Sequence, residues 1–451
     1  MSETVRTGSS AAEVRRVVWA SYIGTTVETY DFVLYGSAAA LLFGRLFFTN
    51  LGPSVGLIAS FGTFATGFVV RPLGGIIFGA LGDRIGRKPV LLVTMIMMAL
   101  GCGLVGVLPT HDQIGAAAAV ALVVLRLVQG LAFGGEWGSA TLMVAEHADP
   151  RRRGFYTAVG QAGLPSGAVL ATLALAAVTQ LPEGQLFSWG WRIPFLLSFA
   201  LLLVGVRIRR QVSESPLFVE PEARAARPKP IRELLSRNGG SLVRGILVAL
   251  PAPVASTLFS GFAVAYAAGA GHSRSVVLLA VSVGFGVSIV TIPLFGLLSD
   301  RIGRRLIYTA GAISFAVVVY PFFWAVSSSS TVLLFLGFAV GFGVIGVVIA
   351  SVLGAVLTEL FPTQARSTGV SVAYQCAGLI AGLFPALFSA VLAASGGGKN
   401  SQWVALIVVS VMVLAGLIVW FGAENTGRNL SAVDEDRRET APDLGPTPAV
   451  G

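Results

Sequence analysis

The sequence contains little charge and very few cysteines or histidines. Of its 451 residues, only 12% are Asp, Glu, Lys or Arg, whereas 55% are hydrophobic. A soluble domain carries about twice that share of charge, so the composition excludes an ordinary water-soluble protein. The two cysteines, Cys102 and Cys376, each stand alone in an apolar segment, which excludes a disulfide framework. The three histidines fall in expected loops, so we expect neither a metal site nor a histidine proton relay.

Long apolar runs occupy most of the chain instead, and the mean hydropathy is +0.80. A helix needs about 20 apolar residues to cross a bilayer. Twelve runs are long enough: residues 17–48, 55–80, 89–109, 115–145, 155–179, 191–208, 243–269, 275–299, 306–326, 331–358, 367–394 and 401–422. Because lipid offers no hydrogen-bond partner to an irregular backbone, each run is predicted to be a helix. The first run is too long for a signal peptide, and we expect it to be retained. The predicted fold class is all-α integral membrane.

The basic residues gather in alternate loops between these runs. They include Arg84, Arg87 and Lys88 after the second run, Arg151, Arg152 and Arg153 after the fourth, and Arg301, Arg304 and Arg305 after the eighth. The opposite loops hold only Arg274 and Lys399. This asymmetry predicts a multi-pass protein of the inner (plasma) membrane with both termini in the cytoplasm. The net charge of +9 is then a topology signal, so we expect no nucleic-acid partner.

The chain repeats itself around one long polar connection. GALGDRIGRK at 79–88 matches GLLSDRIGRR at 296–305, and each copy follows the second run of its half. The repeat predicts six-helix bundles at 17–208 and 243–422, joined by a cytoplasmic linker at 209–242. A cytoplasmic segment at 1–16 precedes them and a cytoplasmic tail at 423–451 follows. Two like halves around a central path are typical of secondary transporters.

The repeated motif and two following echoes predict a cytoplasmic gate made of charge pairs. The candidate gate residues are Asp83, Arg84, Arg87, Asp300, Arg301, Arg304, Glu146, Arg153, Glu359 and Arg366. These pairs would hold the inner side shut until the halves rock apart. The alternative is that the basic residues only mark the inner face, but an Asp at the same place in both copies favours the gate.

Two carboxylates interrupt the first apolar run. Glu28 and Asp31 are three residues apart and share one helix face, with Tyr35 one turn further on. Charge inside a bilayer is costly, and such residues usually line ion or proton paths. We therefore predict that Asp31, helped by Glu28, carries a coupling proton. The alternative is a structural carboxylate paired permanently with an arginine.

Other charges inside the apolar runs could serve as its partners or bind substrate. Arg126 has Gln129 on its face, and we expect it both to neutralise a carboxylate and to bind an anionic substrate. For Arg71, structural pairing and substrate contact stay open. Glu136 is predicted to be a charge-pair partner. The candidate substrate-binding set is Arg126, Arg71, Gln129 and Tyr35.

No pattern points to an enzyme. GFGVIG at 341–346 matches the glycine spacing of a dinucleotide site but lies inside an apolar run with no preceding strand. No nucleophile–base constellation appears. We expect no cofactor, with the proton gradient as the driving force.

Several motifs together carry a family resemblance. They are GTTVETYDFVLYG, RPLGGIIFGALGDRIGRK, RLVQGLAFGGEWGSA, RGFYTAVGQAGLPSG, WGWRIPFLLS, ESPLFVE and ELFPTQARSTGVSVAYQ. They resemble the metabolite:proton symporter family of the major facilitator superfamily, which includes proline/betaine, α-ketoglutarate, shikimate and citrate carriers. The resemblance implies twelve helices in two pseudo-symmetric six-helix bundles and proton-driven uptake. It places coupling and substrate binding at Glu28, Asp31, Arg71, Arg126 and Glu136.

The sequence thus predicts a proton-coupled importer that works by alternating access. The buried arginines favour a carboxylate-bearing metabolite, and we expect an organic acid such as a dicarboxylate. Zwitterionic osmolytes such as proline or betaine remain the alternative substrate. A drug or metabolite exporter and a sensor on the same fold remain the alternative functions. The expected partners are the small-molecule substrate, protons and the lipid bilayer, and we expect a monomer.

Overall fold

The computed structural model describes residues 10–214, 234, 239–362, 365–395, 400–422, 426–427 and 430. Residues 1–9, most of the predicted linker at 209–242 and most of the predicted tail at 423–451 lie outside the described residues. Within the described residues, all regular secondary structure is helical and there is no strand.

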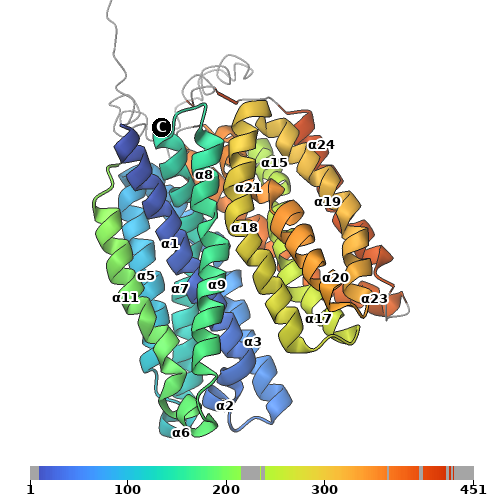
Figure 1. The fold of residues 1–451 in the computed structure, drawn as a ribbon. Coiled ribbons are helices and arrows are strands. Elements are labelled where there is room, and N and C mark those ends of the chain that lie inside the picture. Colours follow the sequence, from blue (N-terminus) through green and yellow to red (C-terminus); the bar gives the residue numbers. More distant parts are fainter. Residues whose placement is uncertain are drawn as a thin grey trace, which may run out of the picture.

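The first half of the chain forms one bundle of helices, drawn from blue to green in Figure 1. Its elements are α1 (Ala11–Ala38), η1 (Ala39–Phe43), α2 (Gly44–Phe47), α3 (Pro53–Val69), α4 (Arg71–Ile85), α5 (Arg87–Val107), α6 (His111–Ile114), α7 (Ala117–His147), α8 (Arg153–Gln161), α9 (Gly163–Val178), α10 (Glu183–Gln185), η2 (Leu186–Gly190) and α11 (Arg192–Arg210). Elements named η are wider π-helical turns inside or next to the α-helices.

The second half forms the other bundle, drawn from yellow to red. Its elements are α15 (Gly239–Ala249), α16 (Pro251–Thr257), η3 (Leu258–Phe262), α17 (Ala263–Gly269), α18 (Arg274–Ile302), α19 (Arg304–Ser327), α20 (Thr331–Leu336), η4 (Gly337–Gly346), α21 (Val348–Leu360), α22 (Arg366–Ala381), α23 (Phe384–Ala394) and α24 (Gln402–Trp420). GFGVIG lies inside this bundle, in η4, as expected for an apolar helix rather than a phosphate loop.

The helices agree with the predicted apolar runs. In the described part of the chain, eleven helices are long and apolar enough to cross a membrane, and they match the second to the twelfth run. The first run is also helical and continues from α1 through η1 and α2 to Phe47. Its polar residues, Glu28 and Asp31 among them, make it less apolar than the others. The prediction of an all-α membrane fold in two bundles is confirmed.

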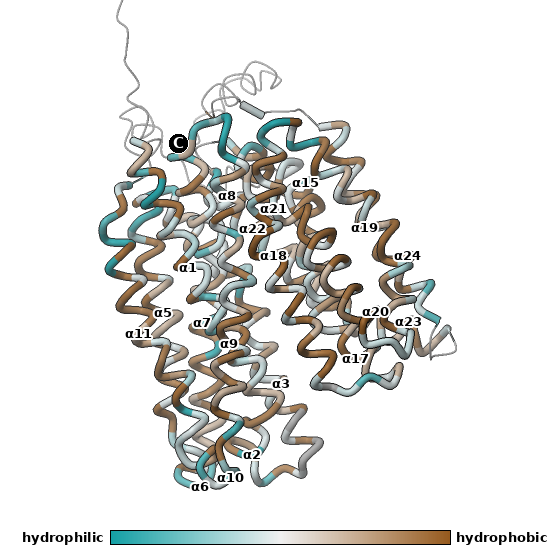
Figure 2. The backbone as a smooth tube through the Cα atoms, in the orientation of Figure 1, coloured by the Kyte–Doolittle hydropathy of each residue, from teal (hydrophilic) through white to brown (hydrophobic). Residues whose placement is uncertain are grey.

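The described helices of the two bundles meet at one end of the molecule. In Figure 1 they converge at the top, where α8 faces α18 and α21, and diverge toward α6 and α17 at the bottom. Glycines allow this approach, because a Cβ on Gly79 would lie 2.8 Å from the Cα of Thr368 and one on Gly296 would lie 2.7 Å from the carbonyl oxygen of Gly154. Both copies of the repeated motif lie at this end, which we call the motif end. Figure 2 shows many hydrophilic residues at this end and hydrophobic residues along the helices.

Candidate functional site

The predicted coupling and substrate-binding residues and the predicted charge-pair partner all lie inside the first bundle. Glu28, Asp31 and Tyr35 come from α1, Arg71 from the start of α4, and Arg126, Gln129 and Glu136 from α7. None of these seven residues is more than 8% exposed. Helix α7 packs against both α1 and α4, so the fold brings the three groups to one region.

Arg126 lies among aromatic rings rather than beside a carboxylate. Its Nη1 donates to Oε1 of Gln129 at 3.3 Å, and its guanidinium carbon lies 4.5 Å from the ring centre of Tyr35 and 4.7 Å from that of Phe64. A Cβ on Gly67 would lie 2.6 Å from Nε, so glycine is needed to admit the arginine. Among the described residues, Arg126 forms no ion pair.

Arg71 has the same kind of surroundings. Its guanidinium carbon lies 3.7 Å from the ring centre of Phe133, 4.2 Å from Phe68 and 4.4 Å from Phe32. The Phe32 ring centre is also 4.9 Å from the guanidinium carbon of Arg126, so both cations flank one ring. Arg71 likewise forms no ion pair within the described part of the chain. Aromatic faces stabilise a cation without neutralising it, so both arginines keep their charge available to an anion.

The two carboxylates are incompletely paired. Oδ1 of Asp31 accepts a hydrogen bond from the Ser198 hydroxyl at 2.6 Å, while Oδ2 of Asp31 and Oε1 of Glu28 are buried with no hydrogen-bond partner in the described structure. Buried polar atoms are rarely left unpaired, and a carboxyl oxygen in this state can carry a proton. The Tyr35 hydroxyl is already engaged, because it donates to Oγ1 of Thr63 at 2.9 Å.

Glu136 forms an ion pair, but with a residue that the sequence analysis did not single out. Its carboxylate pairs with Arg209, in the last turn of α11, which also donates to the carbonyl of Leu91 at 2.5 Å. A Cβ on Gly24 would lie 2.0 Å from Nη2 of Arg209. The sequence places Arg209 among the basic residues at the start of the linker, and nothing in that pattern marks it as buried.

At the motif end, Asp83 binds the start of a helix in the other bundle. Its carboxylate accepts from the backbone N–H of Ser367 at 3.0 Å, and from the N–H and hydroxyl of Thr368 at 2.9 and 2.7 Å. Both residues lie in the first turn of α22, where unpaired N–H groups and the helix dipole attract an anion. Arg87 lies 3.8 Å from Asp83 and 3.2 Å from Glu146. Nη1 of Arg366 lies 3.9 Å from Glu146.

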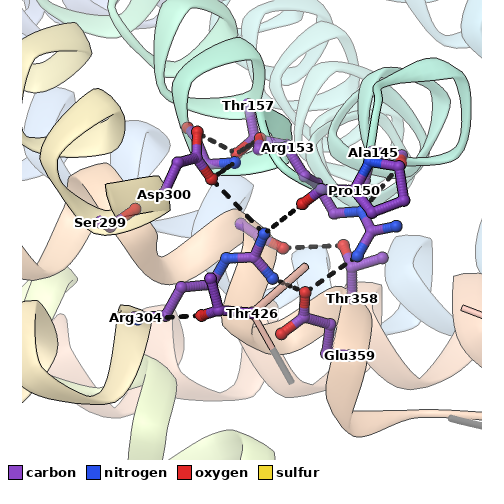
Figure 3. A network of polar contacts seen from close by, with 12 residues as sticks. Ala145, Pro150, Arg153, Thr157, Ser299, Asp300, Arg304, Thr358, Glu359 and Thr426 are labelled. Atoms are coloured by element: carbon purple, nitrogen blue, oxygen red, sulfur yellow. Dashed lines mark hydrogen bonds and ion pairs between the residues drawn. The ribbon is translucent and has the colours of Figure 1, made fainter. Parts of the chain in front are cut away.

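The second copy of the motif repeats this arrangement in the opposite direction, as Figure 3 shows. Asp300 accepts from the backbone N–H groups of Gly154 at 2.8 Å and Phe155 at 2.7 Å, at the start of α8. Arg304 lies 3.6 Å from Asp300 and pairs with Glu359. Glu359 also accepts from Arg153 across the bundles at 3.0 Å.

Eight of the ten candidate gate residues take part in these contacts. The side chains of Arg84 and Arg301 are exposed at the motif end. Nothing in the sequence marks the backbone N–H groups of Ser367, Thr368, Gly154 and Phe155 as partners of these carboxylates. Almost every residue type carries a backbone N–H group, so the residue type gives no signal for such a contact.

Comparisons with known proteins show which family this chain belongs to. Residues 17–229 match a family model described as "Sugar (and other) transporter", and residues 245–446 match one described as "Major Facilitator Superfamily". The shikimate transporter of Escherichia coli (strain K12) is 37% identical over 374 residues, 82% of this chain and 85% of the relative. The chain belongs to the major facilitator superfamily. Its match to a metabolite carrier agrees with the family that the motifs indicate.

A second curated relative supports this membership, and a solved structure shows the same fold. The proline/betaine transporter of Escherichia coli (strain K12) is 31% identical over 80% of this chain and 74% of the relative. The structure of the proton:xylose symporter XylE from E. coli, bound to 6-bromo-6-deoxy-D-glucose, superposes with a TM-score of 0.74 over 94% of this chain and 99% of that one. At 18% identity that likeness shows the fold alone. This major facilitator protein is therefore a multi-pass membrane transporter of small molecules and not an enzyme.

Proposed function

We propose that this transporter is a proton-coupled importer of a small carboxylate-bearing metabolite, with an organic acid as its substrate. The observation that carries the proposal is the pair of buried arginines, Arg71 and Arg126, which form no ion pair within the described residues and flank one ring. A buried cation without a counter-ion is costly, and a carboxylate bound by its fork of N–H groups removes that cost. Gln129 holds one end of the Arg126 guanidinium.

The coupling proton follows from the nearby carboxylates. While Glu28 and Asp31 are ionised, they offset the charge of the two arginines in the same buried region. Protonation leaves the region positive, and an anion then binds more tightly. Each carboxyl has an unpaired buried oxygen that can hold the proton. Asp31 is the principal carrier, Glu28 assists it, and no cofactor takes part.

Alternating access follows from the contacts at the motif end. The basic loops orient this end toward the cytoplasm in the inner membrane. The contacts of Asp83 and Asp300 then form a closed cytoplasmic gate, and the described conformation is the one that loads from outside. Separation of the two bundles at these contacts would release substrate inward.

A zwitterionic osmolyte is the second candidate substrate. The proline/betaine relative favours it, and so does the presence, in one bundle, of buried carboxyl oxygens without a hydrogen-bond partner and of arginines without an ion pair within the described residues. A zwitterion presents a carboxylate to Arg126 and a cationic group to Glu28 or Asp31.

The test is uptake by the purified protein in liposomes, with the acid side outside. Labelled dicarboxylates, citrate, shikimate, aromatic acids, proline and betaine form the panel. We expect an organic acid to accumulate, a protonophore to abolish the accumulation, and Arg126→Gln to raise the KM at least tenfold. Arg45→Gln is the matched control, because Arg45 is exposed and pairs with Glu183 away from the site.

The alternatives give different results. If only proline or betaine accumulates, the substrate is a zwitterion and not an organic acid. Accumulation that survives the protonophore would refute proton coupling, and no uptake of any compound would favour an exporter or a sensor.

A further inference from the structure

A groove lies on the outside of the first bundle, near the motif end, between α1 and α11. Its volume is about 540 Å³. Its lining includes Arg15, Arg16, Trp19 and Ile23 of α1, Ile208 of α11, and Gln211, which directly follows α11. The groove is thus basic at one end and apolar at the other. It is separate from the buried charges of the transport site.

The basic end of the groove carries uncompensated charge. The side chains of Arg15 and Arg16 are exposed, and neither forms an ion pair within the described residues. The nearest carboxylate along α1, that of Glu13, instead accepts a hydrogen bond from the Ser213 hydroxyl. Two exposed cations in a concave site attract an anion of matching size.

Along the membrane normal, the residues that line the groove span one leaflet of a bilayer. Asp31 lies near the middle of the continuous helix from Ala11 to Phe47. With a rise of about 1.5 Å per residue, Arg16 lies ~22 Å from Asp31, Trp19 ~18 Å and Ile23 ~12 Å. The hydrocarbon of one leaflet is about 15 Å thick, with headgroups extending to roughly 20–22 Å. Arg16 therefore reaches the headgroups, Trp19 the interface and Ile23 the acyl chains.

We propose that this groove binds an anionic phospholipid of the leaflet at the motif end. The phosphate lies against Arg15 and Arg16, and an acyl chain follows Ile23 and Ile208. Trp19, which is 56% exposed, packs at the interface, where tryptophan is enriched. The apolar half of the groove selects a lipid over a free phosphate, because a soluble anion leaves that half uncovered. The basic residues select an anionic headgroup.

The test measures lipid binding to the purified full chain by native mass spectrometry, with phosphatidylglycerol and phosphatidylcholine as probes. We expect roughly thirtyfold weaker binding of phosphatidylglycerol to the double variant Arg15→Gln/Arg16→Gln, and little change for phosphatidylcholine. The matched control is Arg151→Gln/Arg152→Gln, which removes two exposed arginines from the turn before α8, outside the groove. Equal loss in the control would overturn the proposal, because it would show only non-specific attraction.

A second measurement, fluorescence quenching, shows where the lipid binds. It leaves Arg15 and Arg16 unchanged. Brominated phosphatidylglycerol in nanodiscs should quench the fluorescence of Trp19, obtained as the difference between the wild type and Trp19→Phe. Brominated phosphatidylcholine should quench it several-fold less. Equal quenching by the two lipids would overturn the proposal. So would displacement of phosphatidylglycerol by an equal concentration of glycerol phosphate, because the site would then read a free phosphate.

Discussion

The indole ring of Trp137 lies parallel to the phenol ring of Tyr374, with the ring centres 3.6 Å apart and an angle of 4° between the planes. Trp137 belongs to α7 and Tyr374 to α22, so the stack joins the two bundles. Next to it, the side-chain amide of Gln375 donates to the carbonyl of Phe133 at 3.2 Å. Along α7, Trp137 lies between Arg126 and Glu146. Along this helix, the stack therefore lies between the buried Arg126 and the contacts at the motif end.

Replacing Tyr374 by Ala should loosen this barrier. An aromatic stack contributes about 0.5–1.5 kcal/mol beyond its buried area, so we expect the motif side to open roughly two- to tenfold more often. The measurement is the rate at which an impermeant maleimide labels Ser371→Cys, which is buried against Gly138, in a chain with Cys102 and Cys376 replaced. Tyr374→Phe is the control and should label at the original rate. Equal rates for Ala and Phe would mean that the stack does not limit access.

Asp83→Asn and Asp300→Asn should each weaken the closed state. Both carboxylates accept two backbone N–H groups at the start of a helix in the opposite bundle, and losing such a cap costs about 0.5–2 kcal/mol. We expect faster labelling of the same cysteine and a larger effect in the double variant. Asp149→Asn is the control, because Asp149 accepts from the N–H of Arg151 at 2.7 Å within its own bundle. If Asp83→Asn, Asp300→Asn and the control all label at the rate of the unmodified gate, the two carboxylates do not hold the gate closed.

Asp31→Asn should abolish proton-driven accumulation while leaving exchange of labelled for unlabelled substrate. The amide keeps the size of the side chain and can still accept from Ser198, but it cannot carry a proton at the same place. Uptake by the wild type should fall as the outside pH rises, and exchange by the variant should not depend on pH. Asp112→Asn, at an exposed position near the far end of the bundle, should behave as the wild type. Full accumulation by the Asp31 variant would refute its coupling role.

Glu136→Gln should destabilise the protein, because it leaves Arg209 buried without its counter-ion. Breaking a buried pair from one side typically costs about 3–5 kcal/mol. We expect a lower Tm in detergent, with partial recovery in Glu136→Gln/Arg209→Gln, in which neither side of the pair carries a charge. Any remaining uptake should keep the KM of the wild type, since the pair holds α7 to α11. A raised KM with an unchanged Tm would instead assign Glu136 to substrate binding.

The fold was predictable from local patterns. Apolar runs of membrane-spanning length, the alternation of basic loops and the two D-R-x-G-R motifs are all visible along the chain. They predicted the helices and the two-bundle arrangement, because lipid allows little besides helices and because similar sequences fold alike. The candidate charges at Glu28, Asp31, Arg71 and Arg126 were visible for the same reason, since a charged residue is conspicuous inside an apolar run.

The partners of these charges were decided by the tertiary structure. The sequence marks Glu136 but not Arg209, 73 residues away, which looks like any other basic residue at a helix end. It marks Asp83 but not the N–H groups of Ser367 and Thr368, which lie 284 and 285 residues further along the chain. Nor does it show that aromatic rings, rather than carboxylates, surround Arg71 and Arg126. The sequence determined which groups are costly to bury, whereas the packing of helices distant in sequence decided which atoms compensate each of them.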